Sequence, residues 1–241
     1  MMKDGSPKSM LWALGSLGLI PLIGTIYVHL NHAGGISHSL VTDLDRQLPF
    51  LPVFVIPYLS WYVFLAVSFV YLICKHQEVY YRTLIQFLAG LLLCYGIYAV
   101  YQTYVPRPEV TGTGTIQKLM GWVYDNDEPF NCFPSTHVLT SYLIMKAYWG
   151  SVRIPKLYRV AVTGMSLLII ISTQFVKQHV LLDIVGAVII AEGLSYAVNR
   201  WLIFKRPVPH VGTSLDMGTI GIKQSLYTER AGSVLQGGLR K

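Results

Sequence analysis

The sequence is poor in charged residues and in cysteine, and both shortages narrow the range of possible proteins. Only 13% of the 241 residues are charged and 53% are hydrophobic, whereas about a quarter of the residues in a soluble domain are charged. The three cysteines, Cys74, Cys94 and Cys132, form neither an even framework nor a CxxC pair. This argues against a disulfide scaffold and a zinc ribbon. The high hydrophobic and low charged content indicates an integral membrane protein. We find no internal repeat and no heptad pattern, so we interpret the chain as one membrane domain.

The hydrophobic residues are concentrated in long apolar runs. A membrane-spanning helix needs about 20 mostly apolar residues, and the sequence predicts an all-α bundle of six transmembrane helices within residues 10–206. The fourth run is the weakest, because it begins with Pro134-Ser135-Thr136-His137 and contains Lys146. The six runs are Met10–Leu30, Phe50–Cys74, Thr83–Val105, Phe133–Trp149, Leu157–Phe175 and His179–Phe204.

Two segments flank this membrane domain. Residues 1–9 are predicted to be a short cytoplasmic N-terminus, and residues 207–241 a polar, glycine-rich cytoplasmic tail. The first run lacks a convincing small-residue cleavage site and is followed by further apolar runs, so we interpret it as a span and not as a signal peptide. The compact chain and its short loops favour a bacterial plasma membrane.

The basic residues predict the orientation of the chain in the membrane. With six spans, both termini lie on one side, and fifteen of the 19 Lys and Arg residues fall on that side. Because cytoplasmic loops carry the excess of basic residues, both termini are expected in the cytoplasm. The net charge of +7 is then a topology signal, and we expect no nucleic-acid partner. The basic residues on the outer side are Arg46, Arg107, Lys118 and Lys177.

Three polar clusters fall where the chain enters or leaves the membrane, and this topology places all three on the outer face. Ionisable groups at such positions are costly and are functional candidates by default. The clusters are Tyr104–Pro108, Asn131–His137 and the segment from Ser172 through His179 to Asp183.

The residue types in these clusters fit phosphoryl transfer. His179 and Asp183 are four residues apart and, on one helix, share a face, so the carboxylate can fix the imidazole tautomer and leave the other nitrogen free to attack. His137 is predicted in the first turn of another helix, where it can donate a proton to a leaving group. Arg107 offers a planar fork that matches phosphate oxygens.

Each of these residues also has a simpler explanation when taken alone. A lone histidine is most often a solvated or satisfied core residue, Arg107 can be an interfacial anchor, and Asp183 can cap a helix or pair with Lys177. The joint pattern favours a site, because Pro-Ser-x-His and His-x3-Asp enter two spans on the same side.

Other ionisable residues receive structural interpretations. His29, His32 and His38 do not have the spacing of a closed metal site, so we expect no metal and no cofactor. Glu192 lies nine residues after Asp183, about half a turn around a helix, and is expected to face away from the site in a structural pair. The acidic turn formed by Asp125, Asp127 and Glu128 is interpreted as a solvated loop, with a lid or a divalent-ion site as alternatives.

The clusters resemble the three signature motifs of the type-2 phosphatidic acid phosphatase superfamily, a family of membrane lipid phosphatases and phosphotransferases. The family motifs read Lys-x6-Arg-Pro, Pro-Ser-x-His and Ser-Arg-x5-His-x3-Asp. Here the second is complete, the third keeps Ser172, His179 and Asp183, and the resemblance spans most of residues 10–204. It implies that His179 is the nucleophile, Asp183 its orienting carboxylate and His137 the acid.

The resemblance also implies a set of phosphate-binding residues, namely Arg107, Ser135 and Ser172. Two family cations are missing, since Val100 stands in place of the lysine and Thr173 in place of the arginine. Lys177, close before His179, can supply one charge. The Asn-Cys-Phe before Pro-Ser and the reduced first motif resemble the inositolphosphotransferase and sphingolipid-synthase branch.

The sequence thus predicts a metal-independent lipid phosphatase that works at the extracytoplasmic face through a phosphohistidine. A phosphotransferase that moves a phosphorylated headgroup between lipids is the alternative, and an inactive relative with a transport or scaffold role is a third hypothesis. The expected partners are a lipid phosphate and the membrane. The lipid and the oligomeric state are left open by the motifs.

Overall fold

A computed structural model describes residues 7–32 and 35–204, with only the backbone described for residues 201–204. The first six residues of the predicted N-terminal segment and the whole predicted tail, residues 207–241, lie outside the described residues. The helices and strands are α1 (Pro7–Leu17), α2 (Leu19–Leu30), β1 (His38–Ser39), α3 (Asp43–Gln47), a 3-10 turn (Pro52–Phe54), α4 (Val55–Lys75), α5 (Gln77–Val100), β2 (Thr103–Tyr104), α6 (Thr115–Asn126), α7 (Thr136–Trp149), α8 (Lys156–Phe175) and α9 (Leu181–Phe204).

The described part of the chain is mostly helical, and within it five helical segments are long and apolar enough to cross a membrane. They correspond to the first, second, third, fifth and sixth predicted runs. The fourth run, Phe133–Trp149, contains α7, which has 14 residues and a length of about 21 Å. A perpendicular crossing of a hydrocarbon core of about 30 Å needs more, so the length of α7 does not support a sixth independent span.

The short α7 lies in the middle of the helices. It packs against α8, α5 and α4. Its side chains Leu139, Leu143 and Ile144 are fully buried. A helix that is covered by protein in this way does not have to match the thickness of the lipid.

The first run is divided into α1 and α2 between Leu17 and Leu19. Pro21 lies in the first turn of α2 and has no backbone N–H, so it cannot donate to the carbonyl of Leu17, four residues earlier. The missing hydrogen bond accounts for the break, although the two helices together form one candidate span, Pro7–Leu30.

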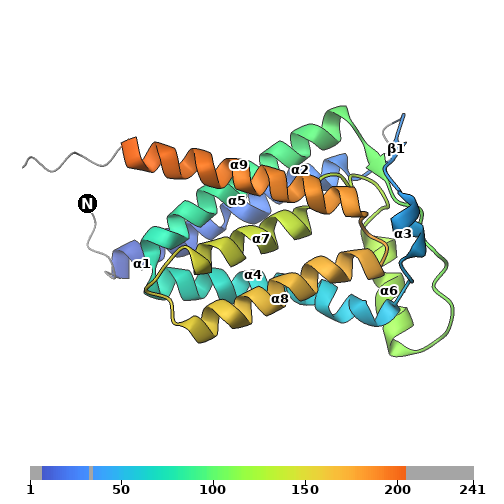
Figure 1. The fold of residues 1–241 in the computed structure, drawn as a ribbon, viewed down its shortest axis with the longest axis horizontal. Helices are drawn as coiled ribbons and strands as arrows, with labels where there is room; N and C mark the ends of the chain where they lie inside the picture. The colour runs from blue at the N-terminus through green and yellow to red at the C-terminus, as the bar shows by residue number, and fades with distance from the viewer. Residues whose placement is uncertain (1–6, 33–34, 205–241) are drawn as a thin grey trace, which may run out of the picture. The chain divides into compact units, whose positions relative to one another are not determined.

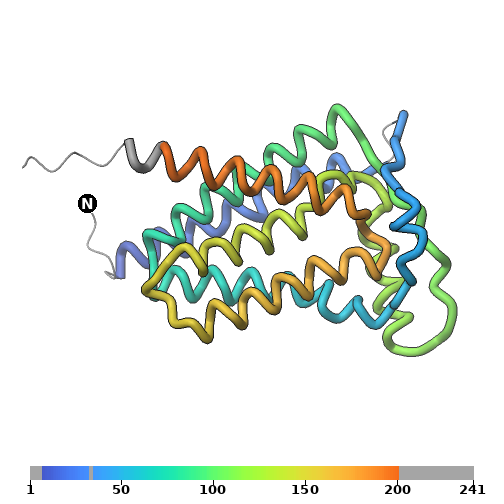
Figure 2. Tube along the Cα trace, viewed as in Figure 1, coloured from blue at the N-terminus to red at the C-terminus, as the bar shows by residue number. Residues whose placement is uncertain are grey.

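The short elements α3, α6 and β1–β2 gather at one end of the long helices, which we call the loop end (Figures 1 and 2). Strands β1 and β2 run parallel, with His38 opposite Thr103. The Thr103 hydroxyl accepts hydrogen bonds from the backbone N–H groups of Cys132 and Phe133, at 3.1 and 2.8 Å. This threonine therefore holds the segment that leads into α7.

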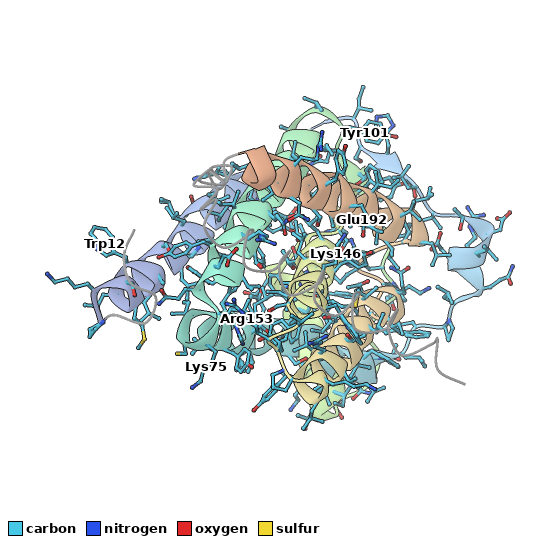
Figure 3. All side chains as sticks on the ribbon, turned by 60° about the vertical axis from the view of Figure 1, so that its left-hand side comes forward. Trp12, Lys75, Tyr101, Lys146, Arg153 and Glu192 are labelled. Atoms are coloured by element: carbon cyan, nitrogen blue, oxygen red, sulfur yellow. The ribbon has the colours of Figure 1, made fainter. Side chains whose placement is uncertain are left out.

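A cluster of three polar residues joins α7 to α9 away from the loop end, and Figure 3 labels Lys146 and Glu192. The Lys146 ammonium and the Tyr142 hydroxyl each donate to a different carboxylate oxygen of Glu192, both at 2.6 Å. The expected structural pairing of Glu192 is confirmed.

A carboxylate from α3 caps the helix that carries Asp183. The buried Asp45 accepts a hydrogen bond from the backbone N–H of Leu181, the first residue of α9, at 2.8 Å, and others from the backbone and hydroxyl of Thr42. Burial raises the pKa of Asp45, but these donors and the charge of Lys177 outweigh it and hold the pKa below 3.8. The first loop of the chain thus fixes the start of its last helix.

Gly186 provides a test of how tightly α9 packs on the segment before α7. A Cβ at this position would lie 2.5 Å from a ring carbon of Phe133, whereas a Cβ at Gly193, in the same helix, would meet nothing within 4 Å. We expect Gly186→Ala to lower the melting temperature, because overpacking costs about 1–3 kcal/mol. Gly193→Ala, with the same gain in helix propensity, is the matched control, and equal melting temperatures for the two variants would contradict this packing.

Asp45 gives a second test, with a defined pH dependence. Asp45→Ala removes the cap of α9 and should lower stability by about 1–2 kcal/mol at neutral pH. A carboxyl whose pKa is lower in the folded chain contributes stability above its unfolded pKa and loses it as the pH falls through the folded value. The difference in melting temperature between the wild type and the variant should therefore be full well above pH 3.8 and shrink only as the pH falls below 3.8, through the lower pKa of the folded chain. Asp43→Ala, at an exposed position of the same helix, is the control, and a pH-independent difference for Asp45→Ala would be the contrary result.

Candidate active site

His179 is held in one tautomer by two acceptors. Its Nδ1 lies 2.9 Å from the carbonyl oxygen of Cys132 and 3.2 Å from Oδ2 of Asp183. Both partners accept only, so Nδ1 carries the proton and, in the neutral ring, Nε2 keeps its lone pair. The arrangement is that of a nucleophilic imidazole oriented by a carboxylate.

The route by which His179 meets Asp183 differs from the prediction. His179 was expected on the same helix as Asp183, but α9 begins at Leu181 and His179 lies in the preceding turn. Asp183 is the third residue of α9, and its Oδ2 also accepts from the backbone N–H of Val180, at 2.9 Å. The predicted contact is present because the Asp183 carboxylate extends past the first residue of α9 and binds the two residues before it, His179 and Val180.

His137 lies in the first turn of α7, as predicted, and faces the His179 ring at a centroid distance of 6.0 Å. Its own ring is packed against Tyr58 and Trp61, with centroids 4.5 and 4.3 Å away. Both of its ring nitrogens are buried and have no hydrogen-bond partner among the described residues. A buried imidazole without a partner is positioned to exchange a proton with a bound group.

Arg107 is fixed by residues of α6 and of the turn before α9. Its guanidinium stacks on the Tyr124 ring at 4.5 Å and donates to the Tyr124 carbonyl oxygen and to Oε1 of Gln178. Tyr124 in turn donates its hydroxyl to the carbonyl oxygen of Val176, at 2.8 Å. Burial raises the pKa of Tyr124 to about 12, with the charge of Arg107 opposing, so this phenol remains a donor.

Lys177 holds α3 against the turn before His179. Its ammonium donates to the carbonyl oxygens of Asp45 and Leu48, at 3.0 and 2.7 Å. Burial lowers the pKa of Lys177, and the charge of Asp45 opposes this shift. The backbone of Lys177 adopts φ = +54°, a region that non-glycine residues seldom occupy outside functional sites.

The two serines of the predicted site differ in place. Ser135 is the N-cap of α7 and accepts from the backbone N–H of Val138, at 3.3 Å, while its own N–H donates to the carbonyl oxygen of Asp183. Ser172 is buried inside α8, donates its hydroxyl to Ile169 and lines neither of the two cavities described next. Ser135 also lines neither cavity, but it precedes the helix of His137 and binds the backbone of Asp183, whereas the hydroxyl of Ser172 bonds within α8.

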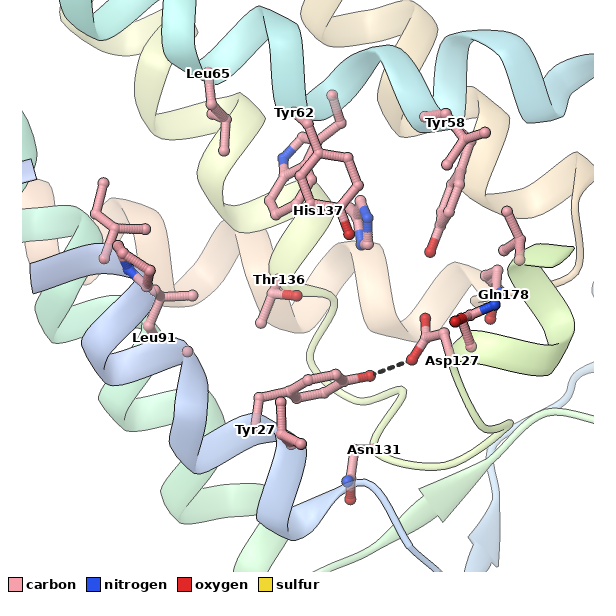
Figure 4. A pocket seen from close by; sticks show the side chains of 18 of the residues that line it. Tyr27, Tyr58, Tyr62, Leu65, Leu91, Asp127, Asn131, Thr136, His137 and Gln178 are labelled. Carbon is pink, nitrogen blue, oxygen red and sulfur yellow. Dashed lines mark hydrogen bonds between the residues drawn. The ribbon is translucent and has the colours of Figure 1, made fainter. Parts of the chain in front are cut away.

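His179 lines two cavities of opposite character. The larger, of about 620 Å³, lies between α2, α4 and α5, is mostly apolar and aromatic, and also contains His137 (Figure 4). The smaller, of about 410 Å³, is lined by Arg46, Arg107 and Lys177 and contains the carboxylate Asp45. A phosphate can bind in the cationic cavity while an apolar group occupies the other, with His179 at the boundary.

The two positions where the family motifs carry cations do not contribute to either cavity. Val100 ends α5 and is 85% exposed. Thr173 is fully buried and donates its hydroxyl to the carbonyl oxygen of Ile170, at 2.7 Å. Among the described residues, the cations that line the smaller cavity are therefore Arg46, Arg107 and Lys177.

Sequence reasoning missed Asp45, Arg46 and Tyr124 as parts of the site. All three lie in the predicted outer loops, at positions without a motif, and reach the site only because α3 and α6 fold onto the loop end. A Thr-x-x-Asp capping box at Thr42 and Asp45 was the one local signal for α3.

The comparison with protein families agrees with this geometry. The chain matches the model described as the PAP2 superfamily over residues 83–207, slightly more than half of its length. No curated protein and no solved structure was found to match. The match contains Arg107, His137, His179 and Asp183, and the chain belongs to the PAP2 superfamily of phosphatases and phosphotransferases that act on lipid phosphates.

Proposed function

We propose that this chain is an integral membrane phosphatase that hydrolyses a lipid phosphate through a phosphohistidine on His179. The observation that carries the proposal is the position of His179, whose Nδ1 is committed to Cys132 and Asp183 and which borders both a cationic and an apolar cavity. The phosphate would bind toward Arg107 and Lys177, and the lipid alcohol toward His137.

The reaction then proceeds in two balanced steps. Nε2 of His179 attacks phosphorus, the bond from phosphorus to the alcohol oxygen breaks, and protonated His137 gives its proton to that oxygen. Water next attacks the phosphohistidine, His137 takes a proton from the water, and the bond from nitrogen to phosphorus breaks to release inorganic phosphate. Asp183 stabilises the positive charge that His179 acquires in the first step.

Charge stabilisation in this scheme comes from side chains, and no metal ion is assigned a role. The planar guanidinium of Arg107 donates hydrogen bonds to two phosphate oxygens in this scheme. Ser135 contributes a hydroxyl at the N-terminus of α7, where free backbone N–H groups favour an anion. The excess of basic residues on the predicted side of the termini supports an extracytoplasmic position for this site.

Transfer to a second alcohol is the alternative function, as in the inositolphosphotransferase and sphingolipid-synthase branch. The observation that favours it is the reduced set of cations, since Val100 lines neither cavity and Thr173 binds its own helix. A phosphodiester carries less charge on the transferred group than a phosphomonoester and requires fewer cations. Water and an alcohol would compete for the same phosphohistidine.

The first test is phosphate release by the purified protein in detergent. We expect release from at least one lipid phosphate, undiminished by EDTA, and a fall of about a thousandfold or more in His179→Ala, because the nucleophile is lost. His76→Ala, in the turn between α4 and α5, is the matched histidine control and should keep most of the activity. Release that persists in His179→Ala would overturn the proposed nucleophile.

A second test addresses the intermediate. When a small alcohol is added, a common phosphohistidine divides between water and alcohol in a ratio that does not depend on the original leaving group. We therefore expect the same ratio of alkyl phosphate to inorganic phosphate from two substrates with different alcohols. A ratio that changes with the leaving group would indicate direct displacement. Transfer without any hydrolysis would identify the chain as a phosphotransferase.

A further inference from the structure

The larger cavity is lined by two carboxylates that the proposed reaction does not use, Asp127 and Glu128. Asp127 follows the end of α6, and its Oδ1 accepts hydrogen bonds from the Tyr27 hydroxyl and the Asn31 amide, at 2.7 and 3.0 Å. Its Oδ2 has no hydrogen-bond partner within residues 7–32 and 35–204. One oxygen of Asp127 is thus engaged by α2, and the other remains able to accept.

The charge of Asp127 is not balanced by a cation of the cavity. None of the described residues that line the larger cavity is Lys or Arg. Arg107 and Lys177 line the smaller cavity instead. The neighbouring carboxylate, Glu128, has a partner in His32, at 3.5 Å. A phosphate is therefore disfavoured beside Asp127, and a neutral or positively charged donor is favoured.

Asp127 lies at the polar end of a cavity that is otherwise mostly apolar. Figure 4 shows Asp127 between Tyr27 and the side chains of Tyr58 and Gln178, at the end of the cavity where His137 lies. The Nε2 atom of Gln178 is buried and has no partner among the described residues. Beyond these groups the wall is apolar and aromatic, with Leu65 and Leu91 as examples. A molecule that fits this cavity has a polar group at one end and a long apolar remainder.

We propose that Asp127 binds a hydroxyl or ammonium group on the alcohol part of the substrate, near its phosphate ester. The inference rests on the proposed function, in which that alcohol lies beside His137 in the larger cavity. It selects lipids whose alcohol is a polyol or an amino alcohol over lipids whose alcohol carries no further donor, such as a simple alkanol, a prenol or a fully acylated glycerol.

A purely structural role for Asp127 is the competing explanation, because its bonds to Tyr27 and Asn31 already tie α6 to α2. Asp127→Asn separates the two roles. The amide oxygen can still accept from Tyr27 and Asn31, while the other atom changes from an acceptor into a donor. A structural residue would lose affinity for all ligands alike, whereas a recognition residue would lose the preference for ligands with a donor.

The decisive experiment measures the binding of chain-matched alcohols to the full-length protein in detergent, with the change in fluorescence of Trp61 and Trp122, which line the cavity, as the readout. The probes are a long-chain 1-alkanol, the corresponding 1,2-diol and the corresponding 2-amino-1-alkanol. We expect the wild type to bind at least one donor-bearing probe about tenfold or more tightly than the alkanol. The diol and the amino alcohol distinguish hydroxyl from ammonium recognition.

In Asp127→Asn this preference should fall to about threefold or less, with the affinity for the alkanol nearly unchanged. Both proteins are measured in the same micelles, so differences in probe partitioning cancel in the comparison. Asp125→Asn, an exposed position on α6 that lines neither cavity, removes the same charge and should behave as the wild type. Equal wild-type affinities, or an unchanged preference in Asp127→Asn, would overturn the inference.

Phosphate release from the phosphate esters of the same three alcohols separates this inference from the proposed function. The wild type should hydrolyse a donor-bearing ester with a higher kcat/KM than the alkyl phosphate, and Asp127→Asn should lose that difference. Hydrolysis without a preference would contradict the role of Asp127 alone. If no ester is hydrolysed or transferred, the proposed function fails, while the binding comparison still decides the inference on Asp127.

Discussion

The shared hydrogen bond of His179 Nδ1 is the constraint on which the rest of the site depends. Its two acceptors come from different segments, the Cys132 carbonyl from the loop before α7 and the Asp183 carboxylate from α9. Each segment must therefore be held independently. Thr103 binds the backbone N–H groups of Cys132 and Phe133, and Asp45 binds the first N–H of α9. The short elements of the loop end thus serve to align one imidazole.

The separation of charge around His179 follows from the same arrangement. Arg107 and Lys177 are both anchored by backbone carbonyls, of Tyr124 for the first and of Asp45 and Leu48 for the second. These bonds direct the two cations toward the smaller cavity, while the larger cavity has aromatic walls and Asp127. In the proposed substrate, the phosphate and its alcohol differ in the same properties as the two cavities, so the electrostatics would orient a bound ester before any bond changes.

The long helices and the histidines were accessible to sequence reasoning, because apolar runs and the Pro-Ser-x-His pattern are local signals. The pairing of His179 with Asp183 was predicted, but its geometry was not, since the start of α9 depends on a cap from Asp45, 136 residues earlier. The shortness of α7 within the predicted run Phe133–Trp149 has a similar cause. Burial of α7 by its neighbours removes the requirement of lipid thickness, and no local pattern reports such burial. Arg46 and Tyr124 were missed because their positions depend on how the loops fold.

The place of His179 on the boundary of two cavities has a consequence for the traffic of products. In the proposed reaction, phosphate would be released on the cationic side of His179 and the alcohol on the apolar side. An ion has water as its destination, and a long-chain alcohol has the bilayer. Once the two have parted, resynthesis of the ester requires both to return from different phases at the same time. The arrangement would leave the equilibrium of the proposed reaction unchanged, but separation of the two products into different phases would keep the reverse reaction slow under dilute conditions.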